Sequence, residues 1–157
     1  MPTLSWSQIG NKTVIGPRNI DLADGAREIK HGNLEAGIEL TLRSLTVATA
    51  REREGGLSNL CAAYALMGDL DVALDYCNQI LFNNDGYWRA YSNRAVIYIL
   101  KKDYVRAERD LLAGLAIHPN SSKLKDVKRM FLDATHPVEQ KVVIDDRNME
   151  TAGKEDQ

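Results

Sequence analysis

A ten-residue segment of this chain recurs 34 positions later, and this repetition limits the fold more than any other feature. The segment YALMGDLDVA, residues 64–73, aligns residue by residue with YILKKDYVRA, residues 98–107. Self-similarity at a period of this size is the signature of stacked repeat units. Because one such unit cannot bury its own apolar face, neighbouring units must stack. We therefore expect a solenoid rather than a single compact motif.

Apolar residues elsewhere recur at helical spacing, as Leu22, Ala26 and Ile29 do at i, i+4 and i+7. A first helix is expected from about 19–21 to the turn at 31–33, and a second from there to about 50. Residues 51–54, Arg-Glu-Arg-Glu, are interpreted as a solvated helix start ahead of the Gly55-Gly56 pair. The later helices are expected at about 57–67, 70–82, 87–101, 104–117 and 122–133. The sequence therefore predicts an all-α chain of three helix pairs and one further helix.

The second and third pairs resemble tetratricopeptide repeats, whose pattern is W-x2-L-G-x2-Y, then A-x3-F, then P. The matching positions are Leu57, Leu60, Cys61, Tyr64, Ala73, Cys77 and Asp85 in the second pair, and Tyr91, Arg94, Ala95, Tyr98, Ala107, Leu111 and Pro119 in the third. The first pair is divergent, with Gly25 and Gly37 at the small positions but Asp21, Asp24, Glu28 and Thr41 where apolar residues are expected. The resemblance implies a right-handed superhelix of antiparallel helix pairs.

This resemblance divides the chain into three parts. Residues 1–18 are expected to form an extended arm, which carries Trp6 and either lies against the domain or is disordered. Residues 19–133 would hold the repeats, at about 19–53, 54–87 and 88–121, and a capping helix at 122–133. Residues 134–157 are expected to be a mobile polar tail whose only apolar patch is 142–144, Val-Val-Ile.

Members of the family commonly hold a peptide on the concave face, which the first helix of each pair lines. Carried over by position, the groove would include Asn59, Ala62, Ala65, Leu66, Arg89, Asn93, Val96 and Ile99. We expect the apolar members to supply affinity and the two asparagines to set the register, because an amide both donates and accepts hydrogen bonds. The alternative is that both asparagines only cap or solvate the helix surface.

One sub-class of the family, the heat-shock co-chaperones, grips a C-terminal carboxylate with Lys, Asn and Arg from three repeats. Asn59 fits the middle position of that clamp. By the same alignment, Gly25 and Ile29 in the first repeat and Ser92 and Val96 in the third stand where the other clamp residues should be. The sequence therefore predicts apolar anchoring rather than this carboxylate clamp.

The resemblance implies a protein-interaction scaffold or adaptor that binds a peptide segment of a partner. Two alternatives are a small secretion or assembly chaperone for a dedicated client, and a self-associating module in which the arm or the 142–144 patch of one chain fills the groove of another. No phosphate-binding loop, nucleophile elbow or H-E-x-x-H motif occurs, so we expect no enzyme and no cofactor. The histidines, His31, His118 and His136, are interpreted as surface residues.

Charge and cysteine content narrow the partners and the compartment. A net charge of −2 argues against nucleic acid, and no apolar run reaches the length of a membrane span. Cys61 and Cys77 lie on facing helices, so they can form a disulfide or can pack as reduced residues, and two cysteines make a poor zinc site. A cytoplasmic location is expected if Met1 is the native start, and a periplasmic or secreted one if a signal peptide has been removed.

Overall fold

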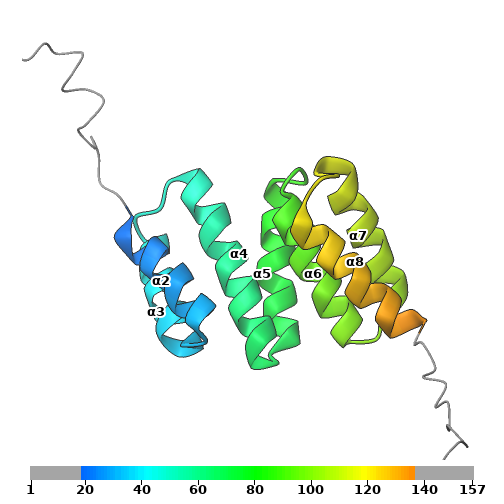
Figure 1. Cartoon of the computed structure of the whole chain (residues 1–157). Coiled ribbons are helices and arrows are strands. Elements are labelled where there is room, and N and C mark those ends of the chain that lie inside the picture. Colours follow the sequence, from blue (N-terminus) through cyan, green and yellow to red (C-terminus); the bar gives the residue numbers. More distant parts are fainter. Residues whose placement is uncertain (1–18, 137–157) are drawn as a thin grey trace, which may run out of the picture.

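The computed structural model describes residues 19–136, which fold into seven α-helices joined by short turns, with no strand among these residues (Figure 1). The helices are α2 (Ile20–His31), α3 (Leu34–Leu45), α4 (Ala50–Met67), α5 (Leu70–Asn83), α6 (Trp88–Leu100), α7 (Tyr104–Ile117) and α8 (Ser122–Thr135). The all-α architecture predicted from the sequence is confirmed.

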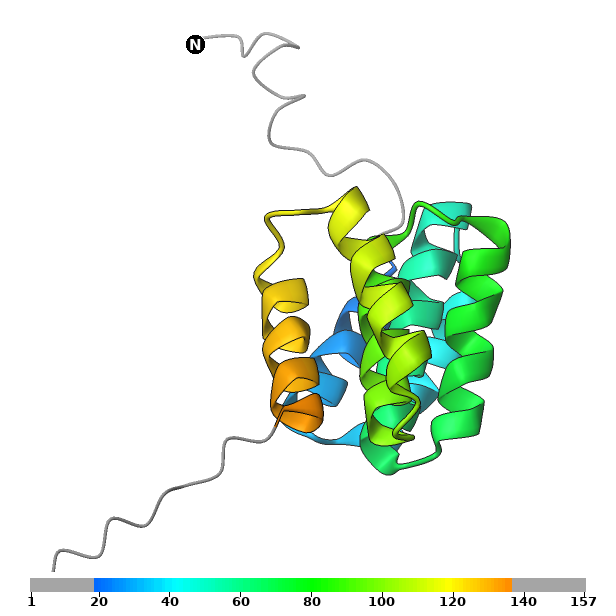
Figure 2. The same cartoon turned by 90° about the vertical axis from the view of Figure 1, so that its right-hand side faces the viewer.

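The helices pack as three consecutive pairs, α2 with α3, α4 with α5, and α6 with α7. The first helices of the pairs also contact one another in order, α2 with α4 and α4 with α6, and α8 continues this row by packing on α6 (Figures 1 and 2). Figure 2 shows α8, in orange, beside α7 at the end of the stack. The row α2, α4, α6 and α8 therefore forms one face of the solenoid.

The turn inside each pair is built on one residue with a left-handed backbone. Gly32 and Gly68 have φ of 87° and 90°, and Lys102 takes the equivalent place in the third pair with φ of 59°. Glycine has no Cβ and adopts this conformation without steric cost, whereas an L-amino acid there is strained by about 1–2 kcal/mol. The repeated segment of the sequence thus contains the turn at which the chain reverses direction between the two helices of the second and third pairs.

The loop between the first two pairs is shorter than the sequence predicted, because α3 ends at Leu45 and α4 begins at Ala50. The expected helix start near residue 57 is therefore wrong, whereas the interpretation of residues 51–54 as a helix start is confirmed. Thr49 and Glu52 form a reciprocal capping box that begins α4 ahead of the glycine pair. Gly56 lies inside this helix at a close contact, because a side chain there would meet Leu45.

The first pair keeps its two helices close with small and polar residues. A methyl group at Gly25 would lie 2.5 Å from Oγ1 of Thr41, and one at Gly37 would meet Ile29. Thr41 is fully buried, but its hydroxyl donates a 2.7 Å hydrogen bond to the carbonyl of Gly37. A polar residue at an apolar position of the pattern is therefore satisfied by the helix backbone.

The third pair departs from the repeat pattern at Arg94, which stands where the pattern has a leucine. Its guanidinium donates two hydrogen bonds, of 2.6 and 2.8 Å, to the carboxylate of Asp110 on α7, and a third to Asn78 on α5. Asp110 is 1% exposed. The hydrogen bond to Asp110 raises the pKa of Arg94, so the guanidinium keeps its charge inside the helix stack.

The predicted N-terminal arm, 1–18, and most of the predicted tail lie outside the described residues, so both stay predictions. Residues 134–136 belong to the end of α8 and the residue after it, not to the tail. Within residues 19–136, no helix is both long enough and apolar enough to cross a membrane.

Candidate functional site

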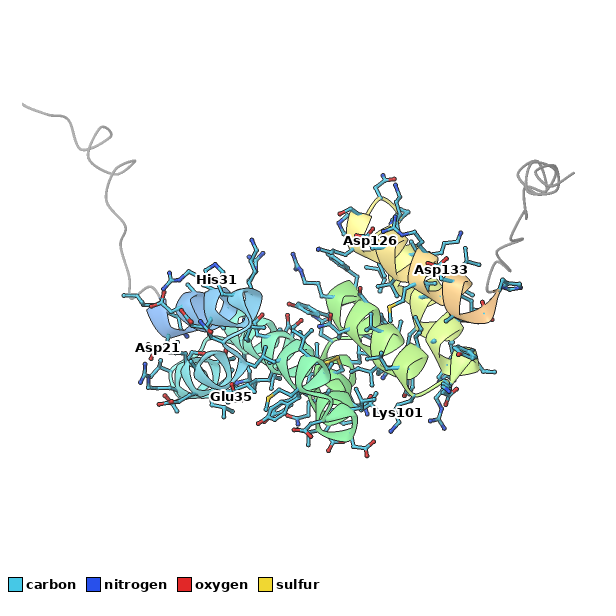
Figure 3. All side chains as sticks on the ribbon, turned by 60° about the horizontal axis from the view of Figure 1, so that its bottom comes forward. Asp21, His31, Glu35, Lys101, Asp126 and Asp133 are labelled. Carbon is cyan, nitrogen blue, oxygen red and sulfur yellow. A yellow bond between two sulfur atoms is a disulfide. The ribbon has the colours of Figure 1, made fainter. Side chains whose placement is uncertain are left out.

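Two adjoining cavities open on the face formed by α2, α4, α6 and α8, and we call them together the groove hollow. The first, of about 290 Å³, is lined by Ser58, Asn59, Ala62, Trp88, Arg89, Ser92, Asn93 and Lys123. The second, of about 420 Å³, is lined by Asn19, Leu22, Ala23, Ala26, Gly55, Ser58, Asn59, Tyr87 and Arg89. Because the cavities share Ser58, Asn59 and Arg89, the groove hollow spans all four helices. Figure 3 shows α2, marked by Asp21 and His31, and α8, marked by Asp126 and Asp133, on either side of α4 and α6.

The two cations of the groove hollow come from the first turns of two helices. Trp88 and Arg89 are the first two residues of α6. Lys123 is the second residue of α8, a helix capped by Ser121, whose hydroxyl oxygen accepts a hydrogen bond from the N–H of Leu124. Unpaired N–H groups at a helix start carry partial positive charge, which adds to that of the two side chains. The first cavity therefore lies where two cations and two helix N-termini meet.

Neither cation is neutralised by an acidic residue in the described part of the chain. The ion pairs there join other residues, and Arg89 instead lies over the ring of Trp88, with its Cζ 4.8 Å from the ring centroid. The ring itself contacts His118 edge-on at 4.9 Å between centroids. Arg89 thus contacts the Trp88 ring and remains exposed to solvent.

Asn93 ties the two central groove helices together. Its side-chain nitrogen donates to both the carbonyl and the hydroxyl oxygen of Ser58 on α4, at 3.3 Å each. Asn59, one repeat earlier, is half-exposed and lines both cavities. The two equivalent asparagines therefore differ, because the donors of Asn93 already bind protein whereas Asn59 faces the hollow.

Four of the eight predicted groove residues line the groove hollow, namely Asn59, Ala62, Arg89 and Asn93. The other four do not. Ala65 and Val96 pack against the core clusters, and Leu66 is 67% exposed outside both cavities. Ile99 is only 6% exposed and belongs to the core between α6, α7 and α8, so it does not offer its side chain to a ligand. The lining is accordingly more polar than the sequence predicted.

Sequence reasoning missed Lys123, because the helix that carries it was interpreted only as a cap. It also left Ser58, Trp88 and Ser92, which line the first cavity, out of the predicted groove set. The signal for Lys123 was present, since it stands 34 positions after Arg89. The last helix therefore acts as the first helix of an incomplete fourth repeat and adds a cation at the same place.

Cys61 on α4 and Cys77 on α5 are bonded through their sulfur atoms in the structure, with their Cα atoms 5.5 Å apart. Both side chains are fully buried in the cluster that also holds Ala73, Ile80 and Ala90. The bond lies within the second pair, away from the groove hollow, so it affects the stability of that pair rather than the lining of the site. Among residues 19–136, no cluster of three or more potential ligands is placed to hold a metal ion.

No protein-family profile matches the chain, and no curated protein matches it in sequence. Solved structures match it in shape. The first TPR domain of human RPAP3 does so with a TM-score of 0.65 at 21% identity, over 74% of this chain and 90% of that one. The TPR2B domain of yeast Sti1 gives 0.62 at 21% identity, over 74% and 97%. The OM64 TPR domain of Arabidopsis gives 0.63 at 14% identity, over 71% and 91%. The chain therefore has the tetratricopeptide-repeat fold predicted from its sequence.

Proposed function

We propose that this chain is a protein-interaction module that binds an acidic peptide segment of a partner protein in the groove hollow. The observation that carries the proposal is the pair of cations, Arg89 and Lys123, that face one open cavity without an acidic partner among residues 19–136. A peptide carboxylate placed between them would form the ion pairs that the protein leaves open.

The shape of the site supports an extended segment rather than a small compact ligand. The two cavities adjoin across four helices and are open to solvent, so a bound chain would run across the helices. Asn59 lies at their junction and can pair with a peptide N–H or C=O group. Ala62 and Trp88 provide the apolar contact in the first cavity, and we infer that they hold one small or medium apolar side chain beside the acidic residue.

Two of the structural neighbours bind peptides of this chemistry. The first TPR of Spaghetti (RPAP3) was solved bound to the HSP90 peptide SRMEEVD, and the second TPR domain of human RPAP3 in complex with the HSP70 peptide SGPTIEEVD. Both peptides contain two glutamates and an aspartate. These two domains are 21% and 20% identical to this chain, and they support the proposal because the same fold binds acidic peptides in both.

Display of randomised peptides on the purified protein tests the proposal without assuming a partner. We expect the retained peptides to be enriched in Asp and Glu over the starting pool, and expect Arg89→Gln with Lys123→Gln to abolish the enrichment. The matched control is Arg109→Gln with Lys125→Gln, which removes two exposed cations that line neither cavity. Retained peptides with no acidic bias, or a bias that survives the first variant, would overturn the proposal.

A further inference from the structure

We propose further that the acidic segment of this chain around Asp145-Asp146 folds back into the groove hollow of the same molecule and competes there with the partner. This inference rests on the proposed function, because it assigns a second acidic segment to the same site. It concerns residues 137–157, which follow the described part of the chain.

Charge selects this segment over the other end of the chain. Residues 137–157 contain six acidic and three basic residues, whereas residues 1–18 contain two basic residues and no acidic one. The groove hollow presents Arg89 and Lys123, and α8 as a whole carries four basic residues against two acidic ones. Attraction between opposite charges therefore favours residues 137–157 as the occupant, and repulsion disfavours residues 1–18.

The order of residues in the segment also matches the lining. Val142, Val143 and Ile144 directly precede Asp145 and Asp146. The lining likewise combines an apolar part with a cationic part. An extended chain can therefore place an apolar side chain on the Trp88 ring and an aspartate between the cations within a few residues.

The length of the chain permits this return. Lys123 is in the first turn of α8, and His136 follows the last residue of that helix. At about 1.5 Å per residue the segment must come back roughly 20 Å along the helix. Asp145 is nine residues beyond His136, and nine residues of extended chain span about 30 Å. The first acidic pair of the segment can thus reach Lys123 without unwinding α8.

A tethered segment has an effective concentration in the millimolar range when its length suits the distance. It therefore occupies the site for part of the time even if its own affinity is weak. The apparent affinity of a partner falls in proportion to the fraction of molecules that are open. The partner must then bind more strongly than the tail, which restricts the site to peptides with better-placed acidic residues.

The closing experiment titrates a fluorescent peptide of residues 139–150 into the whole chain and into Asp145→Asn with Asp146→Asn. We expect the variant to bind the peptide at least about threefold more tightly, because its own segment no longer competes. Glu155→Gln with Asp156→Asn is the matched control, which removes the same charge from the same segment and should bind as the unmodified chain does. Equal affinity in all three proteins would overturn the self-occupancy and leave the proposed function standing.

Binding of the peptide to none of the three proteins would also overturn the self-occupancy, and the display experiment above then decides separately whether the groove accepts acidic peptides at all.

Carbodiimide cross-linking, which joins a lysine amine to a carboxylate, identifies the residues that are in contact. We expect a monomeric product that joins the Lys123 amine to the carboxylate of Asp145 or Asp146, lost in Lys123→Gln. Cross-linked dimers in place of that monomeric product would overturn the intramolecular arrangement.

Discussion

Replacing Asp110 by alanine removes one partner of the buried ion pair between α6 and α7. The Asp110 carboxylate is 1% exposed and accepts two hydrogen bonds from Arg94, at 2.6 and 2.8 Å. Without it the guanidinium keeps only Asn78 and remains mostly buried. Breaking one side of a buried pair costs about 3–5 kcal/mol, because the remaining charge is desolvated without compensation. A domain of this size is stable by roughly 6–18 kcal/mol, so the loss would be a large part of the total.

Urea unfolding measures this loss directly. With a slope of about 1–3 kcal/mol per molar urea, the midpoint should fall by at least about 1 M. Asp71→Ala is the matched control, since the ion pair of Asp71 with Lys101 is exposed and should contribute less than about 1 kcal/mol.

The double variant Arg94→Met with Asp110→Leu separates charge from packing. Because it removes both charges and keeps most of the volume, it should be close to the unmodified protein in stability. The reasoning is refuted if Asp110→Ala lowers the free energy of unfolding by less than about 1 kcal/mol. It is also refuted if the double variant loses as much stability as Arg94→Met alone and Asp110→Leu alone added together.

Three other changes test the remaining parts of the fold. Replacing Cys61 and Cys77 by alanine should lower the free energy of unfolding by about 3 kcal/mol, since a cross-link that closes a 15-residue loop contributes roughly that much; an unchanged urea midpoint in the variant, or two free thiols in the unreduced protein, would contradict this. Gly25→Ala should cost about 1–3 kcal/mol in thermal unfolding because its methyl group would crowd α3, whereas Gly55→Ala, which meets open space, should be neutral or slightly stabilising. The hydrogen bonds from the backbone N–H and the hydroxyl of the capping threonine lower the pKa of Glu52 below its ordinary value of 4.5. Its stabilisation is therefore complete above the unfolded pKa and lost as the pH falls through the lower folded pKa. Glu52→Gln should accordingly lose less stability than the unmodified protein between pH 7 and pH 3, and equal losses would count against the capping box.

The repeat architecture could be predicted because its signals are local. The turns at Gly68 and Lys102 lie at the same place in two matching segments, and the apolar spacing on each side is helical. Asn59 and Arg89 followed from the same spacing, since the groove face of a helix is fixed once its partner face is known. Sequence periodicity was therefore sufficient for the fold and for placing four of the eight predicted residues on the groove hollow, and their role in binding stays a prediction.

The errors arose where a distant contact decides the local structure. Gly55-Gly56 is unfavourable inside an isolated helix, but the close approach of the Leu45 side chain favours a residue without a side chain at Gly56. Ile99 has the spacing of a groove residue, yet the packing of α7 and α8 buries it. Arg94 occupies a position where the pattern has a leucine, and its partner Asp110 lies 16 positions later on another helix. None of these contacts leaves a periodic signal in the sequence.

Charge reversal in the groove hollow tests the central claim most directly. The measurement is the composition of peptides that Arg89→Glu with Lys123→Glu retains in the display experiment, set against that of the unmodified protein. Because both positions face the same open cavity, the account predicts that the preference reverses from acidic to basic peptides. A variant that folds normally and still retains acidic peptides would contradict the account, since the two cations would then not determine what the groove binds.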